Sequence, residues 1–154
     1  MSFRAVIFDL DGVLADSEPW WNEIDKKLLA EYGVTYRGEY HRNVLGVSYR
    51  LAVEFYKKAF GLSVPTEEDE IERGKPHPDI YLRAAEKLGL VADECLVIED
   101  AFSGIAAAKA AKMRVAAIPD TRFVDPRAFE KEAASVLGSL SEIPALVRRI
   151  GAAE

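Results

Sequence analysis

The chain has 154 residues, of which 49% are hydrophobic and 30% are charged. This length is sufficient to bury one core, so we expect one principal globular domain. The net charge of −6 argues against partners such as nucleic acids and anionic membrane surfaces, because both require clustered Lys and Arg.

The only cysteine, Cys95, lies in the apolar run CLVI, which predicts a buried side chain and no disulfide framework. No segment approaches the ~20 apolar residues that a membrane-spanning helix needs. The N-terminus also lacks the basic and apolar regions of a signal peptide. We therefore expect a cytoplasmic protein with no membrane contact.

The first half of the chain predicts one strand followed by helices. Residues 5–8 are continuously apolar and predict a short buried strand over residues 4–10. A helix is expected to begin at Ser17, its predicted N-cap, and to stop at Gly33. A second long helix is expected from Ser48 to Gly61. The apolar stripes predicted for these helices are Trp21, Ile24, Leu28 and Tyr32 in the first, and Leu51, Phe55, Ala59 and Leu62 in the second.

The second half alternates strands with helices. A polar, proline-rich stretch begins at residue 64 and predicts a connector. A helix then follows from Pro78 to Gly89, with Ile80, Ala84 and Leu88 as its expected stripe. Such alternation favours parallel βαβ units and a doubly wound α/β fold. The remaining predicted elements are strands at 95–98, 114–118 and 135–137, and helices at 103–111, from about 125, and at 141–150.

Acidic residues follow two of these predicted strands. Asp9 and Asp11 come after the first strand, and Glu99 and Asp100 after the second. Ligands bind beyond the carboxyl ends of parallel strands, and acids gathered there repel one another unless a cation neutralises them. Hard oxygen ligands favour Mg²⁺. The alternative is that these acids cap helices and face water.

This arrangement also suggests a reaction. An aspartate such as Asp9, beside a metal, can attack phosphorus and form an aspartyl phosphate. Asp11 must lie in the turn after the strand, which Gly12 permits, and can exchange protons with the leaving alcohol and with water. Lys75 would add positive charge for the phosphoryl group and for the paired acids.

Three segments resemble known motifs. FDLDGVLADSEP, RGKPHPDIYLRAAEKLGL and LVIEDAFSGIAAAKAAKMRV are similar to the first, third and fourth motifs of haloacid dehalogenase (HAD)-superfamily phosphatases. The resemblance is greatest to the small-cap subfamily that includes β-phosphoglucomutase, phosphoglycolate phosphatase and the sugar and hexitol phosphate phosphatases. It spans nearly the whole chain.

The resemblance implies both a fold and a site. Residues 1–16 and 71–154 would form a HAD-like, Rossmann-like core, and residues 17–70 a partial helical cap and connector. Asp9 would be the nucleophile, Asp11 the acid/base and Lys75 the motif-three lysine. Magnesium would be held by a carboxylate oxygen of Asp9, the main-chain carbonyl of Asp11 and the carboxylate of Asp100, with Glu99 as the companion acid.

The family's second motif, a Ser or Thr at the end of another strand, is missing. Only eleven residues separate Leu62 from Gly74, whereas one βαβ unit takes roughly 30. We therefore expect an internally shortened chain without the second and third core strands. Loss of one phosphoryl donor would cost on the order of 10²- to 10³-fold in rate. Ser48, Ser63 or Thr66 could substitute, but each is better explained as a cap or loop residue.

The missing strands would leave the edge of the first strand bare. An exposed apolar edge invites pairing with another chain, so self-association is expected.

Evidence on the substrate is weaker. Trp21 lies at the site-facing end of the first cap helix in the family arrangement, and Gly12, Lys75 and Arg50 are the other candidate substrate contacts. The segment DSEPWW resembles the sugar and hexitol phosphatases more than the mutase, which has a histidine where Trp21 stands. The alternatives are that Trp20 and Trp21 belong to the core and that Arg50 lies on a solvated helix face.

The sequence therefore predicts a Mg²⁺-dependent phosphatase that hydrolyses a small phosphorylated metabolite, a sugar or polyol phosphate, through an aspartyl phosphate. Two alternatives stay open. One is an impaired remnant that binds metal and phosphate, or a partner, without turnover. The other is a receiver-type phosphoacceptor, since that doubly wound fold also places acids at strand ends.

Overall fold

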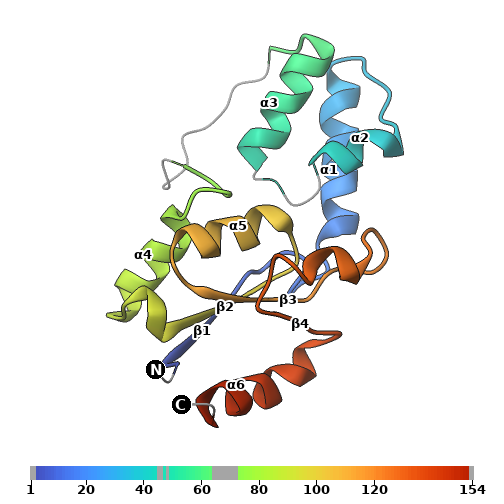
Figure 1. Cartoon of the computed structure of the whole chain (residues 1–154). Coiled ribbons are helices and arrows are strands. Elements are labelled where there is room, and N and C mark those ends of the chain that lie inside the picture. The colour runs from blue at the N-terminus through green and yellow to red at the C-terminus, as the bar shows by residue number, and fades with distance from the viewer. Residues whose placement is uncertain (1–2, 45–46, 48, 64–72, 153–154) are drawn as a thin grey trace.

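Four parallel strands form the sheet of this protein, in the order β1-β2-β3-β4 (Figure 1). The computed structural model describes residues 3–44, 47, 49–63 and 73–152. Continuously apolar runs build the first three strands, as the sequence predicts, and every residue of the first strand pairs with a residue of the second. The strands are β1 (Ala5–Phe8), β2 (Cys95–Glu99), β3 (Arg114–Ala117) and β4 (Ser135–Val136).

Helices cover both faces of this sheet (Figure 1). One face packs on α4 (Asp79–Leu88) and α5 (Phe102–Ala110), and the other on α6 (Ile143–Ala152). Alternation along β2 sends Cys95 and Val97 towards α4 and α5, whereas Leu96 and Ile98 face α6. Glu99 follows the same alternation and therefore lies on the α4 and α5 side. Short 3₁₀ turns complete the connections at Ala92–Glu94, Pro126–Phe129 and Leu140–Glu142.

The strand β1 forms an edge of the sheet within the described residues, since β2 is its only partner there. Its first three residues are half-buried and Phe8 is 38% exposed. The predicted strand is confirmed, but the prediction that it is buried is wrong. The physical reason is position: β2 has neighbours on both sides and is completely buried, whereas none of the described strands lies on the other side of β1.

Three helices form a separate group at one end of the molecule (Figure 1). They are α1 (Glu18–Glu31), α2 (Gly38–Val44) and α3 (Tyr49–Phe60), and they share a small core around Leu29, Val44 and Tyr56. The Tyr56 hydroxyl donates a hydrogen bond of 2.8 Å to the buried carboxylate of Asp25. An analysis that counts only apolar residues does not predict this buried polar pair.

The predicted apolar stripes are displaced from the buried faces. In α1 the buried residues are Asp25 and Leu29, while Ile24 and Tyr32 are exposed. In α4 they are Tyr81 and Ala85, while Ile80 and Leu88 are exposed. In α3 the side chains of Val53 and Tyr56 are buried instead of Leu51. Apolar residues occur on both sides of each stripe, so spacing alone does not set the orientation of the helix.

Helix ends are predicted with mixed success. Gly61 and Gly89 follow α3 and α4 with positive φ, as expected of C-terminal glycines. The prediction that Ser17 caps α1 through its side chain is wrong, since Ser17 has helical φ and ψ and makes no such bond. Its carbonyl instead accepts hydrogen bonds from the amides of Trp20 and Trp21.

Some sequence predictions fall outside the described residues. Ser48, Thr66 and the shortened segment near residues 68–70 are among them. Ser63 is described, and it is exposed three residues after the end of α3. Among the described helices, none combines the length and apolar character that crossing a membrane requires.

The exposed β1 edge leads to a first prediction. We expect wild-type protein to self-associate as its concentration rises, because the free edge of a strand offers amide and carbonyl groups to a second copy. Phe8→Lys should weaken that association by placing a charge on the edge. Leu88→Lys, on the exposed surface of α4, is the matched control and should leave it unchanged. Sedimentation velocity measures both, and a wild type that stays monomeric at all concentrations would contradict the prediction.

Candidate functional site

Three carboxylates meet where β1 and β2 end. Asp9 directly follows β1, Glu99 is the last residue of β2, and Asp100 follows it. The register pairs Phe8 with Ile98, and the Asp9 amide donates a hydrogen bond of 2.9 Å to the Ile98 carbonyl. One oxygen from each of the three side chains lies within 4.8 Å of the others. The two strands are thus direct neighbours, and they bring together three of the four acids that follow them in the sequence, without Asp11.

Gly12 makes room for this cluster. It has a φ of +76°, and a Cβ atom there would lie 2.0 Å from Oδ2 of Asp100. Its amide donates a hydrogen bond of 2.8 Å to the Ala15 carbonyl, which closes the turn after β1. Both the backbone conformation and the close approach require glycine, so the turn predicted at this position is confirmed.

Lys75 supplies the positive charge at the cluster. Its Nζ atom donates a hydrogen bond of 2.8 Å to Oδ1 of Asp9 and another to Oε1 of Glu99. Burial by itself lowers the pKa of the Lys75 ammonium, but the charges of Glu99 and Asp9 outweigh that effect and raise the pKa above its usual value. Lys75 is therefore a fixed cation that partly neutralises the acids.

Glu99 is completely buried and is held by four donors. Its Oε1 accepts hydrogen bonds from Lys75 and from the hydroxyl of Tyr81. Its Oε2 accepts from the backbone amides of Asp100 and Ala101, at 3.1 and 3.3 Å. A carboxylate has about four lone-pair sites, so these donors satisfy it and orient it towards Lys75.

Sequence reasoning missed Tyr81 and Gly104. Tyr81 extends from α4, and burial together with the Glu99 carboxylate raises the pKa of its hydroxyl. Gly104 belongs to the first turns of α5, where a Cβ atom would lie 1.8 Å from Oε1 of Glu99. The available signal for Gly104 was its place inside an alanine-rich helix, since glycine costs about 1 kcal/mol there and usually has a packing reason.

Asp100 is the acid most affected by its surroundings. Burial, followed by the negative charges of Glu99 and Asp9, raises its pKa from about 3.8 to about 7. The three oxygen-donor side chains, the tight turn at Gly12 and this electrostatic repulsion together fit a hard divalent cation. Asp9 and Asp100 would hold it, with Glu99 beside them.

The other predicted site residues do not belong to the three-acid cluster. The exposed Asp11 begins the turn after β1 and its carboxylate is not part of the three-acid cluster. Trp21 in α1 and Arg50 in α3 are half-buried. Their substrate contacts, and the proton transfer assigned to Asp11, stay predictions. Trp20 is 74% exposed, so the alternative that it belongs to the core is wrong.

A cavity of about 280 Å³ continues from the acidic cluster. Asp100 and Ser103 line its core side, and Glu18, at the start of α1, lines its cap side. Neither Trp21 nor Arg50 is among the described residues that line it. Glu18 is therefore a cavity residue that sequence reasoning missed.

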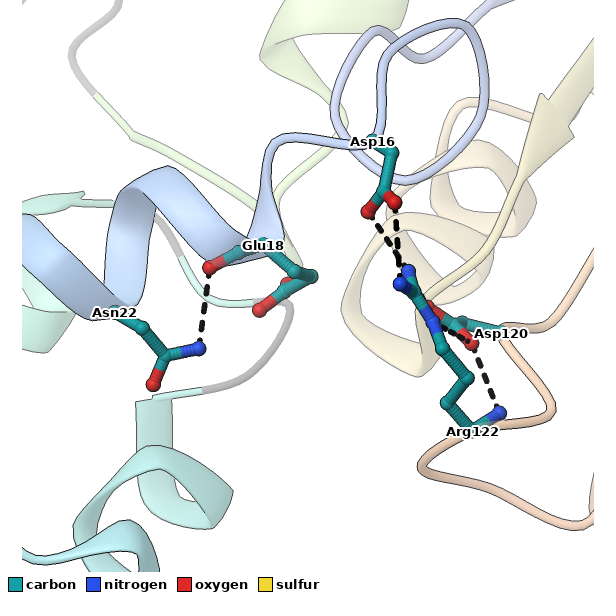
Figure 2. Close-up of polar contacts among 5 residues, drawn as sticks. All are labelled: Asp16, Glu18, Asn22, Asp120 and Arg122. Carbon is teal, nitrogen blue, oxygen red and sulfur yellow. Dashed lines mark hydrogen bonds and ion pairs between the residues drawn. The ribbon is translucent and has the colours of Figure 1, made fainter.

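An arginine ties the entry of the cap to the core beside this cavity. The Arg122 guanidinium donates hydrogen bonds of 2.7 and 3.1 Å to the two carboxylate oxygens of Asp16 (Figure 2). It also donates to Asp120, in the loop after β3, at 2.9 Å. Asp16 is thus held by an ion pair with the core.

Comparisons with known proteins identify the family. Two models, each described as haloacid dehalogenase-like hydrolase, match residues 6–61 and residues 44–112. Together they cover more than half of the chain, including Asp9, Lys75 and Asp100. The chain belongs to the haloacid dehalogenase-like hydrolases.

Two similar curated relatives are phosphatases. The phosphorylated carbohydrates phosphatase of Thermotoga maritima is 28% identical over 175 positions, which cover 70% of this chain and 81% of the relative. Hexitol phosphatase B of Escherichia coli K12 is 24% identical over 195 positions, covering 78% of this chain and 88% of the relative. Both alignments are longer than the 154 residues of this chain, so the relatives carry residues without a counterpart here.

Solved structures support the same fold. A hydrolase from Pseudomonas syringae has a TM-score of 0.74 at 21% identity, covering 92% of this chain and 97% of that one. CbbY from Rhodobacter sphaeroides in complex with phosphate has a TM-score of 0.72 at 20% identity, covering 92% and 96%. The expected HAD-like α/β fold is confirmed.

The raised pKa of Asp100 makes a prediction about stability. From about pH 4 to about pH 7 the folded protein holds a proton on Asp100 that the unfolded chain releases, so this group's contribution to the free energy of unfolding falls as pH rises. In EDTA, wild type should lose stability relative to Asp100→Asn between pH 5 and 8. Mg²⁺ at pH 8 should stabilise wild type only. Denaturant unfolding measures this, and parallel pH profiles would contradict it.

The bond from Tyr81 to Glu99 makes another prediction. Tyr81→Phe leaves one lone pair of a buried carboxylate without its donor, which should cost about 1 to 3 kcal/mol of unfolding free energy. It should also lower kcat for phosphate-ester hydrolysis, because Glu99 no longer holds Lys75 as firmly.

Tyr56→Phe is the matched control, because it removes the same group from another buried carboxylate, Asp25. It should cost stability and leave kcat unchanged. Urea denaturation and steady-state kinetics distinguish the two variants, and equal effects of both on kcat would refute a specific role for Tyr81.

Proposed function

We propose that this protein is a Mg²⁺-dependent phosphomonoesterase acting on a small phosphorylated metabolite, a sugar or polyol phosphate. The family and its named relatives support a phosphoric monoester hydrolase. The observation that carries the finer proposal is the contact of Asp9 with Lys75 beside the Asp100 carboxylate, at the carboxyl ends of two neighbouring strands.

The first chemical step forms a bond between a carboxylate oxygen of Asp9 and the phosphorus of the ester. The bond from phosphorus to the ester oxygen breaks, and Asp11 gives a proton to the leaving alcohol. Lys75 stabilises negative charge on the phosphoryl oxygens. Bound Mg²⁺ would supply further charge stabilisation, held by Asp9, Asp100 and the main-chain carbonyl of Asp11, with Glu99 as companion acid.

The second step regenerates the enzyme. A water molecule attacks the phosphorus of the aspartyl phosphate while Asp11 takes its proton. The bond between phosphorus and the Asp9 oxygen then breaks, which releases inorganic phosphate and restores the carboxylate. Arg50 and Trp21, with the Gly12 turn, are proposed to contact the substrate from the cap and the core.

Phosphate release from a panel of sugar and polyol phosphates tests this proposal. Wild type should release phosphate with Mg²⁺ and not in EDTA. Asp9→Asn should lower the rate by on the order of 10³-fold or more, because it removes the nucleophile. Asp93→Asn, an exposed acid ahead of β2 at the opposite end of the strand, is the matched control and should keep the activity.

Two outcomes would contradict the proposal. Release that persists in EDTA, or that Asp9→Asn leaves unchanged, would sink the mechanism. Mg²⁺-dependent binding of a phosphate analogue without turnover would instead favour a remnant that binds without catalysis. The missing second motif motivates that alternative. We place the protein in the cytoplasm whether it is an active phosphatase or such a remnant.

A further inference from the structure

The loop that carries Asp11 is closed by its own backbone. The amide of Ala15 donates a hydrogen bond of 2.9 Å to the Leu10 carbonyl, and the Gly12 amide donates one of 2.8 Å to the Ala15 carbonyl. Asp11 and Ala15 also form an isolated β-bridge. The position of the Asp11 backbone therefore depends on where Ala15 lies, and so on the next residue of the chain, which is Asp16.

Asp16 is held from outside this loop by Arg122. The two terminal nitrogens of the guanidinium donate hydrogen bonds of 3.1 and 2.7 Å to the two carboxylate oxygens (Figure 2). Paired bonds of this kind fix the orientation of a carboxylate as well as its position. The contact joins residues that are 106 positions apart in the sequence. It therefore attaches the end of the Asp11 loop to the core.

Arg122 is itself fixed in place by the loop after β3. Its backbone amide and its Nε atom each donate a hydrogen bond of 2.9 Å to Oδ1 of Asp120. The guanidinium also lies over the ring of Phe123, 5.5 Å from the ring centroid. Because three contacts within one short loop set the direction of this side chain, the guanidinium is already oriented where it meets Asp16.

A second turn of the same kind shows what is particular about Arg122. Asp125 and Arg127 repeat the Asp-x-Arg pattern, and the backbone amide and Nε of Arg127 donate to Oδ1 of Asp125 at 3.0 and 3.1 Å. Among the described residues, Arg127 donates to no other carboxylate. Such a turn is therefore complete by itself. The bonds from Arg122 to Asp16 are an additional feature that joins one of the two turns to the Asp11 loop.

We propose that Arg122 is a positioning residue that acts through Asp16 to hold the Asp11 carboxyl where it gives its proton to the leaving alcohol. This inference rests on the proposed phosphatase function. Arg122 is not among the described residues that line the cavity, so its effect on the reaction is indirect. An exposed ion pair contributes little to global stability, whereas a small displacement of a catalytic group is enough to slow a reaction.

The leaving group separates the positioning of Asp11 from other effects. When the bond from phosphorus to an alkyl oxygen breaks, its electron pair stays on that oxygen, which takes the proton of Asp11; p-nitrophenolate leaves as an anion and needs no proton. With Mg²⁺ present, kcat/KM reports the steps up to this departure. Arg122→Gln should lower kcat/KM about tenfold for the preferred sugar or polyol phosphate and less than about twofold for p-nitrophenyl phosphate, because it weakens part of the contribution of proton transfer.

Arg127→Gln is the matched control, because it removes the same group from the second turn, and it should leave both values unchanged. Asp16→Asn should reproduce the effect of Arg122→Gln. The double variant should be no slower than the slower single variant, as expected of two residues that act as one unit. Thermal unfolding of each variant confirms that it is folded. Equal losses on the two esters, no loss on either, or additive losses in the double variant would each overturn the inference.

Hydrogen exchange tests the positioning without turnover. The amides of Gly12 and Ala15 donate the hydrogen bonds that close the loop. In metal-free protein they should exchange about two- to fivefold faster in Arg122→Gln than in wild type, and at an unchanged rate in Arg127→Gln. Faster exchange in a protein whose wild type has no turnover would refute the proposed function alone. Wild-type turnover with unchanged exchange in Arg122→Gln would refute the inference alone.

Discussion

The mutual repulsion of three carboxylates is the constraint on which the rest of this structure depends. Asp9, Glu99 and Asp100 lie together because β1 and β2 are parallel neighbours that end at the same level. Such proximity is costly unless positive charge and hydrogen-bond donors are placed around it. The residues around the cluster supply this positive charge and these donors.

Glu99 illustrates this best. It is the most deeply buried of the three acids, and its four donors come from three places: the lysine before α4, a tyrosine inside α4 and two amides after β2. Space for its carboxylate depends on a glycine in α5, and space for Asp100 depends on a glycine in the turn after β1. The geometry of the three acids therefore depends on donors from α4 and the residues before it and after β2, and on small residues in α5 and in the turn after β1.

The internal shortening has a clear structural consequence. The sheet ends at β1 within the described residues, and relatives such as hexitol phosphatase B carry residues that have no counterpart here. The acids survive this loss because they belong to β1 and β2, which pair directly. The resemblance to the family implies that the strand without a counterpart here is the one that would present a phosphoryl donor. Asp16, which precedes the helices α1 to α3, forms an ion pair with Arg122 of the core.

The sequence by itself determined the order of the strands, the acids at the ends of the first two and the turn at Gly12, but not the helix α2 or the 3₁₀ turn at Pro126–Phe129. The features that it determined follow from local patterns, since apolar runs, glycines and motif spacing act over a few residues. Only the tertiary structure decided that β1 is half-buried, that α1 and α4 bury Leu29 and Tyr81, and that Tyr81 and Gly104 shape the surroundings of Glu99. It also decided that Glu18 faces the cavity. Those outcomes depend on contacts between segments distant in sequence, and helical periodicity does not say which side of a stripe meets its neighbour.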